Sequence, residues 1–570
     1  MTTALPVPRT TEDAVAIRAG IAVERLLNTW LRERMAGCMP IKGETCILEV
    51  GAHRVRASCV RSSPGGFHRW RTPVLIEGDD GSVKDTGDPV LVAGLMADAL
   101  LQENGFISSA IKDRLIKAVE GAEQHALACA ARSAEASPIG LEQSLWHGHP
   151  FHPFAKSIDG FSADDIERFA PERANGFQLR WIIAEPGVGA ALWRDRQAQD
   201  RVSSILADLS GLPEKAIGGR LLIPSHPWQA ARLENDPSFA DLVAQGRAIL
   251  TLPTGATMQP TSSVRTVFAP SANIFLKLPI AARITNFART NPLDQIGRSM
   301  AAGRALAAIS AEVAACGLDM LDEPGAIWVD RPGLEAITGV VLRDAPAREA
   351  FVLAGLLEPS PHDGRPMLAA MGCILSGLAE AQAWLRAYVQ TAILPPLRLF
   401  ARTGVSLEAH SQNSLLALDR GNPARLIVRD LEGVSIDRER FESIAPKPSL
   451  HLDLDPSVFF PAEEARHRLV YYLVSNQLNH VVATIARLAD MSETGLWRAV
   501  IEILSTTAED AETAGLVTWL LAAKTLPAKA NFTSCFAGRG ERPDYVAIAN
   551  PLRLAVQEKI AGQQPTALLS

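Results

Sequence analysis

The chain has 570 residues, of which 47% are hydrophobic and 21% charged, and this balance is typical of a globular protein that can bury an enzyme-sized core. Its formal net charge of −7 excludes wholesale wrapping of nucleic acid, although a local basic pocket for a small anion is compatible with it. The length predicts about three to four domains.

The cysteines and the apolar stretches indicate a cytoplasmic protein without a membrane or nucleic-acid partner. No secretory signal is expected, because the first residues lack a basic stretch followed by an apolar one. The most apolar stretches, 91–101 and 516–523, are too short to span a bilayer. The seven cysteines contain no CxxC pair and indicate reduced thiols: Cys38, Cys46, Cys59, Cys129, Cys316, Cys373 and Cys535.

The first predicted unit, residues 1–146, mixes helices and strands. Thr10 and Thr11 can cap a helix that ends near Met35, because apolar residues recur there at helical spacing. Turn residues then separate short antiparallel strands at 46–50, 54–60 and 67–76. Two further helices are predicted at 89–102 and 107–134.

Next comes the segment 147–156, HGHPFHPFAK, with three histidines, two prolines and a lysine. Prolines fix the backbone and remove amide donors, so the segment is not expected inside a helix. Its polar side chains suit a ligand site, and a histidine-rich surface loop is the alternative. Zinc is the weaker interpretation, because Phe151 stands where the aspartate of an HxHxDH motif would be.

The second predicted unit, residues 147–375, contains strands and one long helix at 295–316. Strands are predicted at 177–184, 248–252, 262–268 and 273–278. A second His-Pro run, IPSHPWQ at 223–229, has the form of a helix start with proline in the first position.

Two features of this unit favour an anion. In PTSSVRT, at 260–266, a turn could gather Ser263, Arg265 and Thr266 on a phosphate, and a solvated strand edge is the alternative. Lys277 lies between apolar residues on a predicted buried strand, so it needs an anionic partner, sheds its charge or reaches out to water. If the stretch after it is helical, Thr285 and Arg289 share one face, and Arg289 could reach the same anion.

The third predicted unit, residues 376–570, has two strands, at 413–418 and 426–430, between the polar runs EAHSQN (408–413) and RDLEG (429–433). Carboxylates that end a strand beside an amide are a common way to hold Mg²⁺ on substrate phosphates, and a hairpin with chance polar ends is the alternative. The layout of Asn413 and Asp430 faintly resembles a kinase-type metal site. Long helices are predicted at 377–403, 463–489 and 495–523.

Taken in order, these motifs resemble those of the IucA/IucC family, the siderophore synthetases that work without nonribosomal peptide synthetases. The matching elements are GHPFHPFAKSIDGF (148–161), IPSHPWQ, SVRT (263–266), the Lys277, Thr285 and Arg289 series, EAHSQN, RDLEG and a late NPL (550–552). The resemblance implies an α+β fold shaped as thumb, fingers and palm, with ATP between fingers and palm. It also implies that the palm has a central antiparallel sheet flanked by helices, and that the protein is a homodimer.

The resemblance further implies an ATP- and Mg²⁺-dependent ligase. A carboxylic acid, commonly citrate, would react with ATP to give an acyl-adenylate and pyrophosphate, and an amine or hydroxyl would then displace AMP. The implied nucleotide contacts are Ser263, Arg265, Thr266, Lys277, Arg289, His410, Gln412, Asn413 and Asp430. The implied metal ligands are Glu408, Asp430 and Glu432, and the implied carboxylate contacts are His149, His152, Lys156, Thr285 and Arg289.

Arg289, Lys277 and His410 are the implied catalytic residues. The two cations would neutralise an acid and a phosphate that must meet, and His410 could accept the amine proton. The family's late lysine, on the nucleophile side, is Lys524 or Lys529 here, and Lys529 is favoured. The rival interpretations are a kinase-like phosphotransferase, which would release ADP, and a non-catalytic protein that binds citrate or a siderophore without ATP.

Overall fold

The computed structural model describes residues 11–35, 43–105, 109–132, 136–373, 375–445, 455–506 and 510–555. Thr10, Cys38 and the outer ends of the helix predicted at 107–134 lie outside these residues. The six cysteines within them are free thiols, as expected. None of the helices found in this part of the chain is long and apolar enough to cross a membrane.

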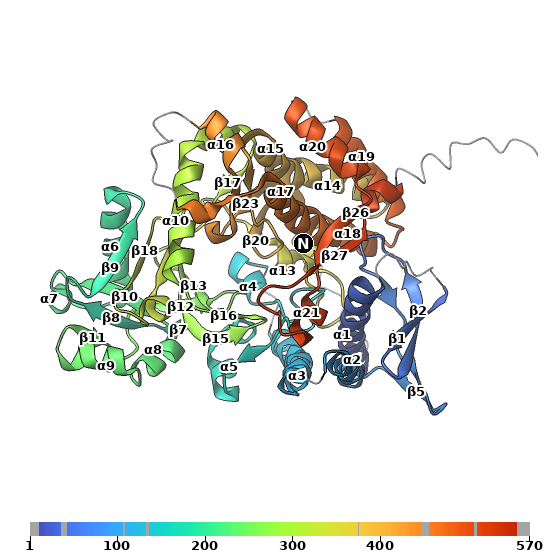
Figure 1. The fold of residues 1–570 in the computed structure, drawn as a ribbon, viewed down its shortest axis with the longest axis horizontal. Helices are drawn as coiled ribbons and strands as arrows, with labels where there is room; N and C mark the ends of the chain where they lie inside the picture. Colours follow the sequence, from blue (N-terminus) through green and yellow to red (C-terminus); the bar gives the residue numbers. More distant parts are fainter. Residues whose placement is uncertain are drawn as a thin grey trace, which may run out of the picture.

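The N-terminal region, drawn in blue in Figure 1, combines helices with an antiparallel sheet. The first helix, α1 (Thr11–Arg34), has acidic residues in its first turn and basic residues in its last, as the helix dipole favours. In α2 (Pro89–Glu103), Asp88 accepts a hydrogen bond from the Val90 amide and proline occupies the first turn. The other elements are β1 (Thr45–Val50), β2 (His53–Arg61), β3 (Arg69–Trp70), β4 (Val74–Gly78), β5 (Val83–Thr86) and α3 (Ala110–Ala131).

The middle of the chain is built on a seven-stranded antiparallel sheet in the order β7-β12-β13-β14-β19-β18-β9. The strand predicted at 262–268 begins only at Thr266, because 261–265 form a turn. The strands are β7 (Phe177–Gln178), β9 (Gly189–Trp193), β12 (Thr257–Pro260), β13 (Thr266–Ala269), β14 (Ile274–Lys277), β18 (Gly325–Val329) and β19 (Val340–Asp344).

Two small sheets accompany this large one. The first contains β8 (Arg180–Ala184), β10 (Leu221–Ser225) and β11 (Ala248–Leu250), with the helices α6 (Arg196–Ser210), α8 (Pro227–Leu233) and α9 (Pro237–Ala244) around it (Figure 1). The second contains β6 (Ile158–Asp159), β15 (Ile280–Ile284) and β16 (Phe287–Arg289). The stretch from Thr285 to Arg289 is therefore part of a β-hairpin and not the helix that we considered.

A four-stranded sheet follows with the order β17-β23-β22-β20. It is antiparallel except where β17 pairs with β23. Arg420 and Gly421 both have positive φ, which a tight two-residue turn between β22 and β23 requires. The strands are β17 (Asp319–Met320), β20 (Phe351–Val352), β22 (Ser414–Asp419) and β23 (Asn422–Val428). The helices of this part of the chain, most of them in the upper half of Figure 1, are α10 (Leu293–Ala308), α14 (Leu378–Tyr388), α15 (Leu394–Thr403), α17 (Ala462–Val470), α18 (Asn479–Leu488), α19 (Thr494–Thr506) and α20 (Ala511–Ala522).

Two of the long predicted helices contain a π-helical segment that the spacing did not indicate. One is η3 (Val389–Ile393), between α14 and α15, and the other is η7 (Tyr471–Leu478), between α17 and α18. Every side chain of η7 is buried. Such wide turns are frequent at functional sites, so η7 is a place to look for one.

Three large cores hold these elements together. One joins the N-terminal helices and sheet to Phe532 and Phe536 of the C-terminal helix α21 (Asn531–Phe536). A second runs from Leu179 to Leu342, and the third from Ala301 to Ala555 together with Leu141 and Leu145. The units bounded at 146 and 375 remain a prediction, and this packing favours assigning part of 301–375 to the third unit.

Candidate active site

The histidine segment forms a series of turns in which imidazole rings cap the backbone. His149 Nδ1 accepts a hydrogen bond from the Phe151 amide at 3.1 Å, and His152 Nδ1 accepts one from the Phe154 amide at 3.2 Å. Each neutral ring therefore carries its proton on Nε2 and can donate a hydrogen bond from it. The prolines that follow both histidines fix the chain in these turns.

These two rings are uncharged at neutral pH. Burial lowers the pKa of His152 to about 3 and that of His149 well below its usual value. They offer N–H donors to an anion and no positive charge. The described residues contain no group of three His, Cys, Asp or Glu side chains that could hold a metal, so the zinc interpretation receives no support.

Lys156 does not share the site in this structure. Its ammonium group donates to the Leu145 carbonyl at 2.7 Å and forms an ion pair with Glu172, whose carboxylate is almost fully buried. Burial alone would raise the pKa of Glu172, but Lys156 and His125 hold it down at about 2. Lys156 could bind a substrate carboxylate only if this buried ion pair broke. In this structure Lys156 instead stabilises the fold of the histidine segment.

The SVRT run forms a tight turn between β12 and β13. Ser263 Oγ accepts a hydrogen bond from the Thr266 amide at 3.1 Å, and Val264 has a positive φ of 66°. Arg265 points inward and donates to the Thr290 carbonyl at 2.9 Å and to Asn291 Oδ1 at 2.6 Å. The turn brings Ser263 and Thr266 together, whereas the Arg265 side chain holds the end of the β15–β16 hairpin. A contact of these three residues with a phosphate stays a prediction.

Thr285 and Arg289 meet across that hairpin. Arg289 Nη2 donates to Thr285 Oγ1 at 2.9 Å, and Thr285 adopts a φ of 57° that few β-branched residues accept. Arg289 Nε is buried and has no hydrogen-bond partner among the described residues. Burial lowers the pKa of Arg289 to about 10, and the group still remains charged at neutral pH. An incoming anion would satisfy the orphaned nitrogen.

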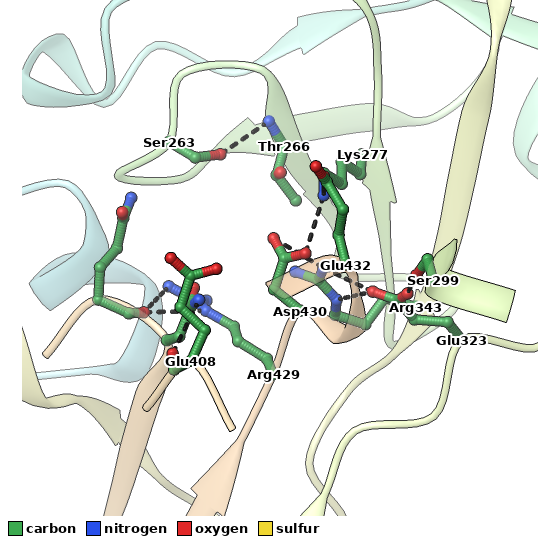
Figure 2. A network of polar contacts seen from close by, with 12 residues as sticks. Ser263, Thr266, Lys277, Ser299, Glu323, Arg343, Glu408, Arg429, Asp430 and Glu432 are labelled. Atoms are coloured by element: carbon green, nitrogen blue, oxygen red, sulfur yellow. Dashed lines mark hydrogen bonds and ion pairs between the residues drawn. The ribbon is translucent and has the colours of Figure 1, made fainter. Parts of the chain in front are cut away.

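Figure 2 shows Lys277 of β14 beside the acids of the RDLEG run. Its Nζ lies 2.8 Å from Asp430 Oδ1 and 3.0 Å from Glu432 Oε2. Burial alone would raise the pKa of Asp430, but Lys277, Arg343 and Arg265 hold it well below its usual range. Lys277 has therefore found the anionic partner that its position demanded, and both acids stay ionised.

Asp430 is also held by Arg343, which in turn pairs with Glu323. Neither of these two residues was singled out from the sequence. Arg343 of β19 lies 3.1 Å from Asp430 Oδ2 and 2.6 Å from Glu323 Oε1, and Glu323 also accepts a hydrogen bond from Ser299 (Figure 2). Arg343 and Glu323 are both nearly inaccessible to solvent. Asp430 has a φ of 72°, a conformation that costs about 1–3 kcal/mol outside glycine and is typical of functional sites.

Glu142 is a third functional residue that the sequence did not reveal. It ends the short helix α4 (Pro138–Glu142) and accepts from Arg429 Nη1 at 2.5 Å and from Ser262 Oγ at 2.5 Å. Gln412 Nε2 lies 3.3 Å from the same serine oxygen. A buried glutamate thus ties the SVRT turn to the EAHSQN and RDLEG runs, although nothing in its local sequence marks it.

His410 repeats the histidine cap, since its Nδ1 accepts from the amides of Gln412 and Asn413, each at 3.2 Å. Its ring lies 5.8 Å from that of Tyr472 in η7. Burial lowers the pKa of His410. Because Nδ1 already accepts two hydrogen bonds, the proton of neutral His410 is on Nε2. His410 is therefore better suited to donate a hydrogen bond than to accept the amine proton, the role that we predicted.

Lys529 reaches the same region from β26 (Thr525–Lys529), where its Nζ lies 3.2 Å from Tyr472 Oη and above the rings of Tyr471 and Tyr472. Burial lowers the pKa of Lys529. Lys524 is exposed. Of the two candidate lysines, the structure therefore brings Lys529 to the site and leaves Lys524 outside it.

The π-helical segment η7 forms one wall of the site. The side-chain amide of Asn476 lies 3.3 Å from His149 Nε2, and Tyr472 contacts both His410 and Lys529. Residue Gln477 donates to Tyr388 Oη at 2.6 Å, which fixes the segment from its far side. The extra residue per turn thus turns several polar side chains of one helix toward the ligand region.

The three acids predicted as magnesium ligands do not form a single cluster. Asp430 and Glu432 share Lys277, whereas Glu408 lies near Tyr472, whose pKa it raises after the larger effect of burial. Mg²⁺ on a nucleotide is commonly held by one or two carboxylates together with the phosphates and water. Asp430 and Glu432, which share Lys277, match that donor set. Glu408 does not form a cluster with them.

Comparisons with known proteins show which family this chain resembles. Residues 137–358 match the family model described as IucA / IucC family, and residues 382–544 match one described as ferric iron reductase FhuF-like transporter. L-2,3-diaminopropanoate–citrate ligase of Staphylococcus aureus is 32% identical over 565 residues, which cover 93% of this chain and 95% of the relative. Spermidine-citrate ligase of Bacillus anthracis is 27% identical over 323 residues, 52% of each chain.

The fold also has a close counterpart among solved structures. The ATP-bound aerobactin synthetase IucA of a hypervirulent Klebsiella pneumoniae pathotype aligns with a TM-score of 0.82 at 23% identity, covering 93% of this chain and 99% of that one. The relatives define an enzyme of the ligase class, and the structural match shows its fold. The chain belongs to the IucA/IucC family.

Proposed function

We propose that this enzyme uses ATP to activate a carboxylic acid, citrate being the first candidate, and joins it to an amine or hydroxyl. The observation that carries the proposal is the meeting of two kinds of anion-binding group. One set consists of neutral imidazole donors and Arg289, and the other of Lys277 with two ionised acids. The two sets are close enough to interact, because the charge of Arg289 helps to lower the pKa of His152, and Glu432 and Asp430 act to raise the pKa of Arg289 against the larger effect of burial. The relatives named above are citrate ligases, which supports citrate as the acid.

In the first step, a carboxylate oxygen forms a bond to the α-phosphorus of ATP, and the bond between the α- and β-phosphates breaks. The products are an acyl-adenylate and pyrophosphate. Arg289 and Lys277 reduce the repulsion between the two anions, and His149, His152 and His410 donate N–H groups to oxygens that gain charge. Removing one such preorganised donor typically slows a reaction by about 10²–10³.

In the second step, the amine nitrogen bonds to the acyl carbon and the bond from that carbon to AMP breaks. The nitrogen releases its proton to water, and an amide and AMP leave. We assign Lys529 and Tyr472, whose polar atoms lie 3.2 Å apart, to the nucleophile side of the pocket. A magnesium ion held by Asp430 and Glu432 would supply positive charge to the phosphates of ATP.

The test is a pair of assays on the purified enzyme. Citrate should elicit pyrophosphate from ATP, and hydroxylamine should trap the acyl-adenylate as citryl hydroxamate. Pyrophosphate release should not occur without an acid. The assignment fails if no carboxylic acid in a panel of citrate, citrate monoamides, 2-oxoglutarate and succinylated amines elicits pyrophosphate.

The kinase-like alternative makes a different product from the same site. A phosphotransferase would release ADP, because it transfers the γ-phosphate. A non-catalytic citrate- or siderophore-binding protein would bind its ligand equally well without ATP, and the ionised pair at Asp430 and Glu432 would then have no task. We further propose that the enzyme is a cytoplasmic homodimer.

A further inference from the structure

The leaving pyrophosphate of the proposed first step needs positive charge of its own. Arg289 and Lys277 are assigned above to the place where the acid meets the α-phosphate, whereas negative charge gathers on the β- and γ-phosphates as the bond to the α-phosphorus breaks. A cation that reaches these phosphates would stabilise the leaving group. Asp430 and Glu432, the proposed magnesium ligands, mark the region in which to expect it.

Glu432 has one cation at each of its two carboxylate oxygens. Its Oε2 lies 3.0 Å from Lys277 Nζ, and its Oε1 lies 3.8 Å from Nη2 of Arg298, a residue of α10 that belongs to none of the sequence motifs. A distance of 3.8 Å is too long for a hydrogen bond, so Arg298 is attracted to Glu432 by charge alone. The Nε of Arg298 is buried and has no hydrogen-bond partner among the described residues. This guanidinium therefore has N–H groups to offer to a ligand.

Packing fixes the turn of α10 that carries Arg298. The helix lies against η4 (Leu431–Gly433), the short helix that contains Glu432. Ser299, the next residue of α10, donates a hydrogen bond to Glu323, which belongs to the same polar network (Figure 2). Arg298 is thus held beside the two acids by contacts that do not involve its own side chain.

The Arg298 side chain is also accessible from solvent. It is 25% exposed, whereas the Lys277 side chain is 5% exposed. The other acid near this turn is Asp455, whose pKa is lowered mainly by its hydrogen bonds with Ser457 and to a smaller extent by Arg298. The pair with Glu432, at 3.8 Å, is the closest ion pair of Arg298 within the part of the chain that the structure describes. Among those residues, Arg298 is therefore a cation at the proposed phosphate region without a close anionic partner.

We propose that Arg298 binds the β- and γ-phosphates of ATP and stabilises pyrophosphate as it leaves. The inference rests on the proposed function and adds a residue that acts on the leaving group. When the bond from the α-phosphorus to the bridging oxygen breaks, the electron pair stays on that oxygen, and Arg298 donates hydrogen bonds to the pyrophosphate without transferring a proton. A planar guanidinium pairs well with two phosphate oxygens at once.

The test compares two products that bind to different parts of the site. Pyrophosphate and AMP should each inhibit citrate-dependent hydroxamate formation by the wild type. In Arg298→Gln, we expect the inhibition constant of pyrophosphate to rise about tenfold to a hundredfold, because a charge-assisted contact is lost. The inhibition constant of AMP should stay the same, since AMP lacks the β- and γ-phosphates. Arg298→Lys keeps the charge and should recover part of the affinity for pyrophosphate.

The matched control is Arg304→Gln, which removes the charge of the other arginine of α10. It should keep both inhibition constants. Calorimetry with magnesium pyrophosphate, without ATP or an acid, should detect weaker binding to Arg298→Gln than to the wild type. Equal inhibition of Arg298→Gln and the wild type by pyrophosphate, an equal loss of AMP binding, or an equal effect of Arg304→Gln would overturn the inference. If no acid elicits pyrophosphate from the wild type, the proposed function fails, and the calorimetric comparison still decides whether Arg298 binds pyrophosphate.

Discussion

Three histidines of the site, His149, His152 and His410, hold their Nδ1 atoms against main-chain amides. The sequence marked these residues because His-Pro and HSQN runs are conspicuous, and it could not show the tautomer, which depends on the turn that each ring caps. Lys156 was conspicuous for the same reason, yet its partner, Glu172, lies on another turn. Residue type and spacing thus located the site without assigning every role.

The first prediction concerns His410. In His410→Asn the shorter amide can still accept the backbone amides through Oδ1 but can no longer donate at the Nε2 position. We expect the variant to fold and to form hydroxamate about 10²–10³ more slowly. His410→Gln, which can place a donor near Nε2, should recover part of the rate. If both variants lose only a limb of the pH–rate profile, His410 is a proton acceptor and the donor role is wrong.

The second prediction concerns Arg289. Arg289→Ala removes the guanidinium whose Nε lacks a partner among the described residues, so citrate-dependent pyrophosphate release should fall by about 10²–10³ or more. The thermal midpoint should change little, because Arg289 makes only local hydrogen bonds within its hairpin. Arg283→Gln, on the same hairpin, is the control and should retain pyrophosphate release. A fully active Arg289→Ala enzyme would refute the assignment.

At the scale of elements, the site lies where turns and strand ends from several sheets meet. The strands β14 and β22 and the start of helix α8 lie within one residue of their predicted positions, because apolar runs and proline positions mark them directly. Strand β23 was predicted at 426–430 and in fact spans Asn422–Val428, because the turn before it has only two residues. The β15–β16 hairpin was considered as a helix, because Thr285 and Arg289 have helical spacing and the turn at 285–286 lacks glycine. The π-helical segment η7 was not predicted, because the spacing of its apolar residues differs only slightly from that of an α-helix.

The third prediction concerns how β19 supports the RDLEG run. Arg343→Met leaves Glu323 buried without its cation and removes one of the partners of Asp430. We expect a loss of about 3–5 kcal/mol in the free energy of unfolding, measured with urea. The double variant Arg343→Met/Glu323→Gln should recover part of this loss. An unchanged unfolding midpoint in the single variant would show that the pair does not hold the site.

For the whole molecule, the three cores explain why a single chain can assemble one site from distant segments. The chain returns at α21 to the N-terminal core, where Glu33 of α1 accepts hydrogen bonds from the amides of Phe532 and Thr533. The sequence indicated a mixed α+β protein and the order of its motifs. It could not indicate this return, or the link from Glu142 to Arg429, because neither has a local pattern.

The fourth prediction concerns the pH dependence of stability. Several buried histidines have pKa values lowered by burial to about 3 or 4, so they stabilise the fold above their unfolded value of 6.5 and lose that contribution as pH falls. Three buried glutamates have pKa values raised by burial to about 7 or 8, so their contribution is lost as pH rises. Stability should therefore be greatest between about pH 6 and 7.

Urea unfolding across a pH series measures this directly. Glu358, which accepts the amides of His147 and Gly148, has the most strongly raised pKa of the three glutamates, at about 8. Glu358→Gln should flatten the decline between pH 6.5 and 8, because the variant has no proton to lose there. A stability that keeps rising up to pH 8 in the wild type would contradict this account.

If a carboxylate oxygen of citrate attacks the α-phosphorus of ATP, that oxygen must remain in AMP after the amide has formed. Citrate labelled with ¹⁸O in its carboxylates should be supplied with ATP and 2,3-diaminopropanoate, and the products analysed by mass spectrometry. We predict one labelled oxygen in AMP and none in pyrophosphate. Label in inorganic phosphate together with ADP, or amide formation that leaves AMP unlabelled, would contradict the adenylation mechanism.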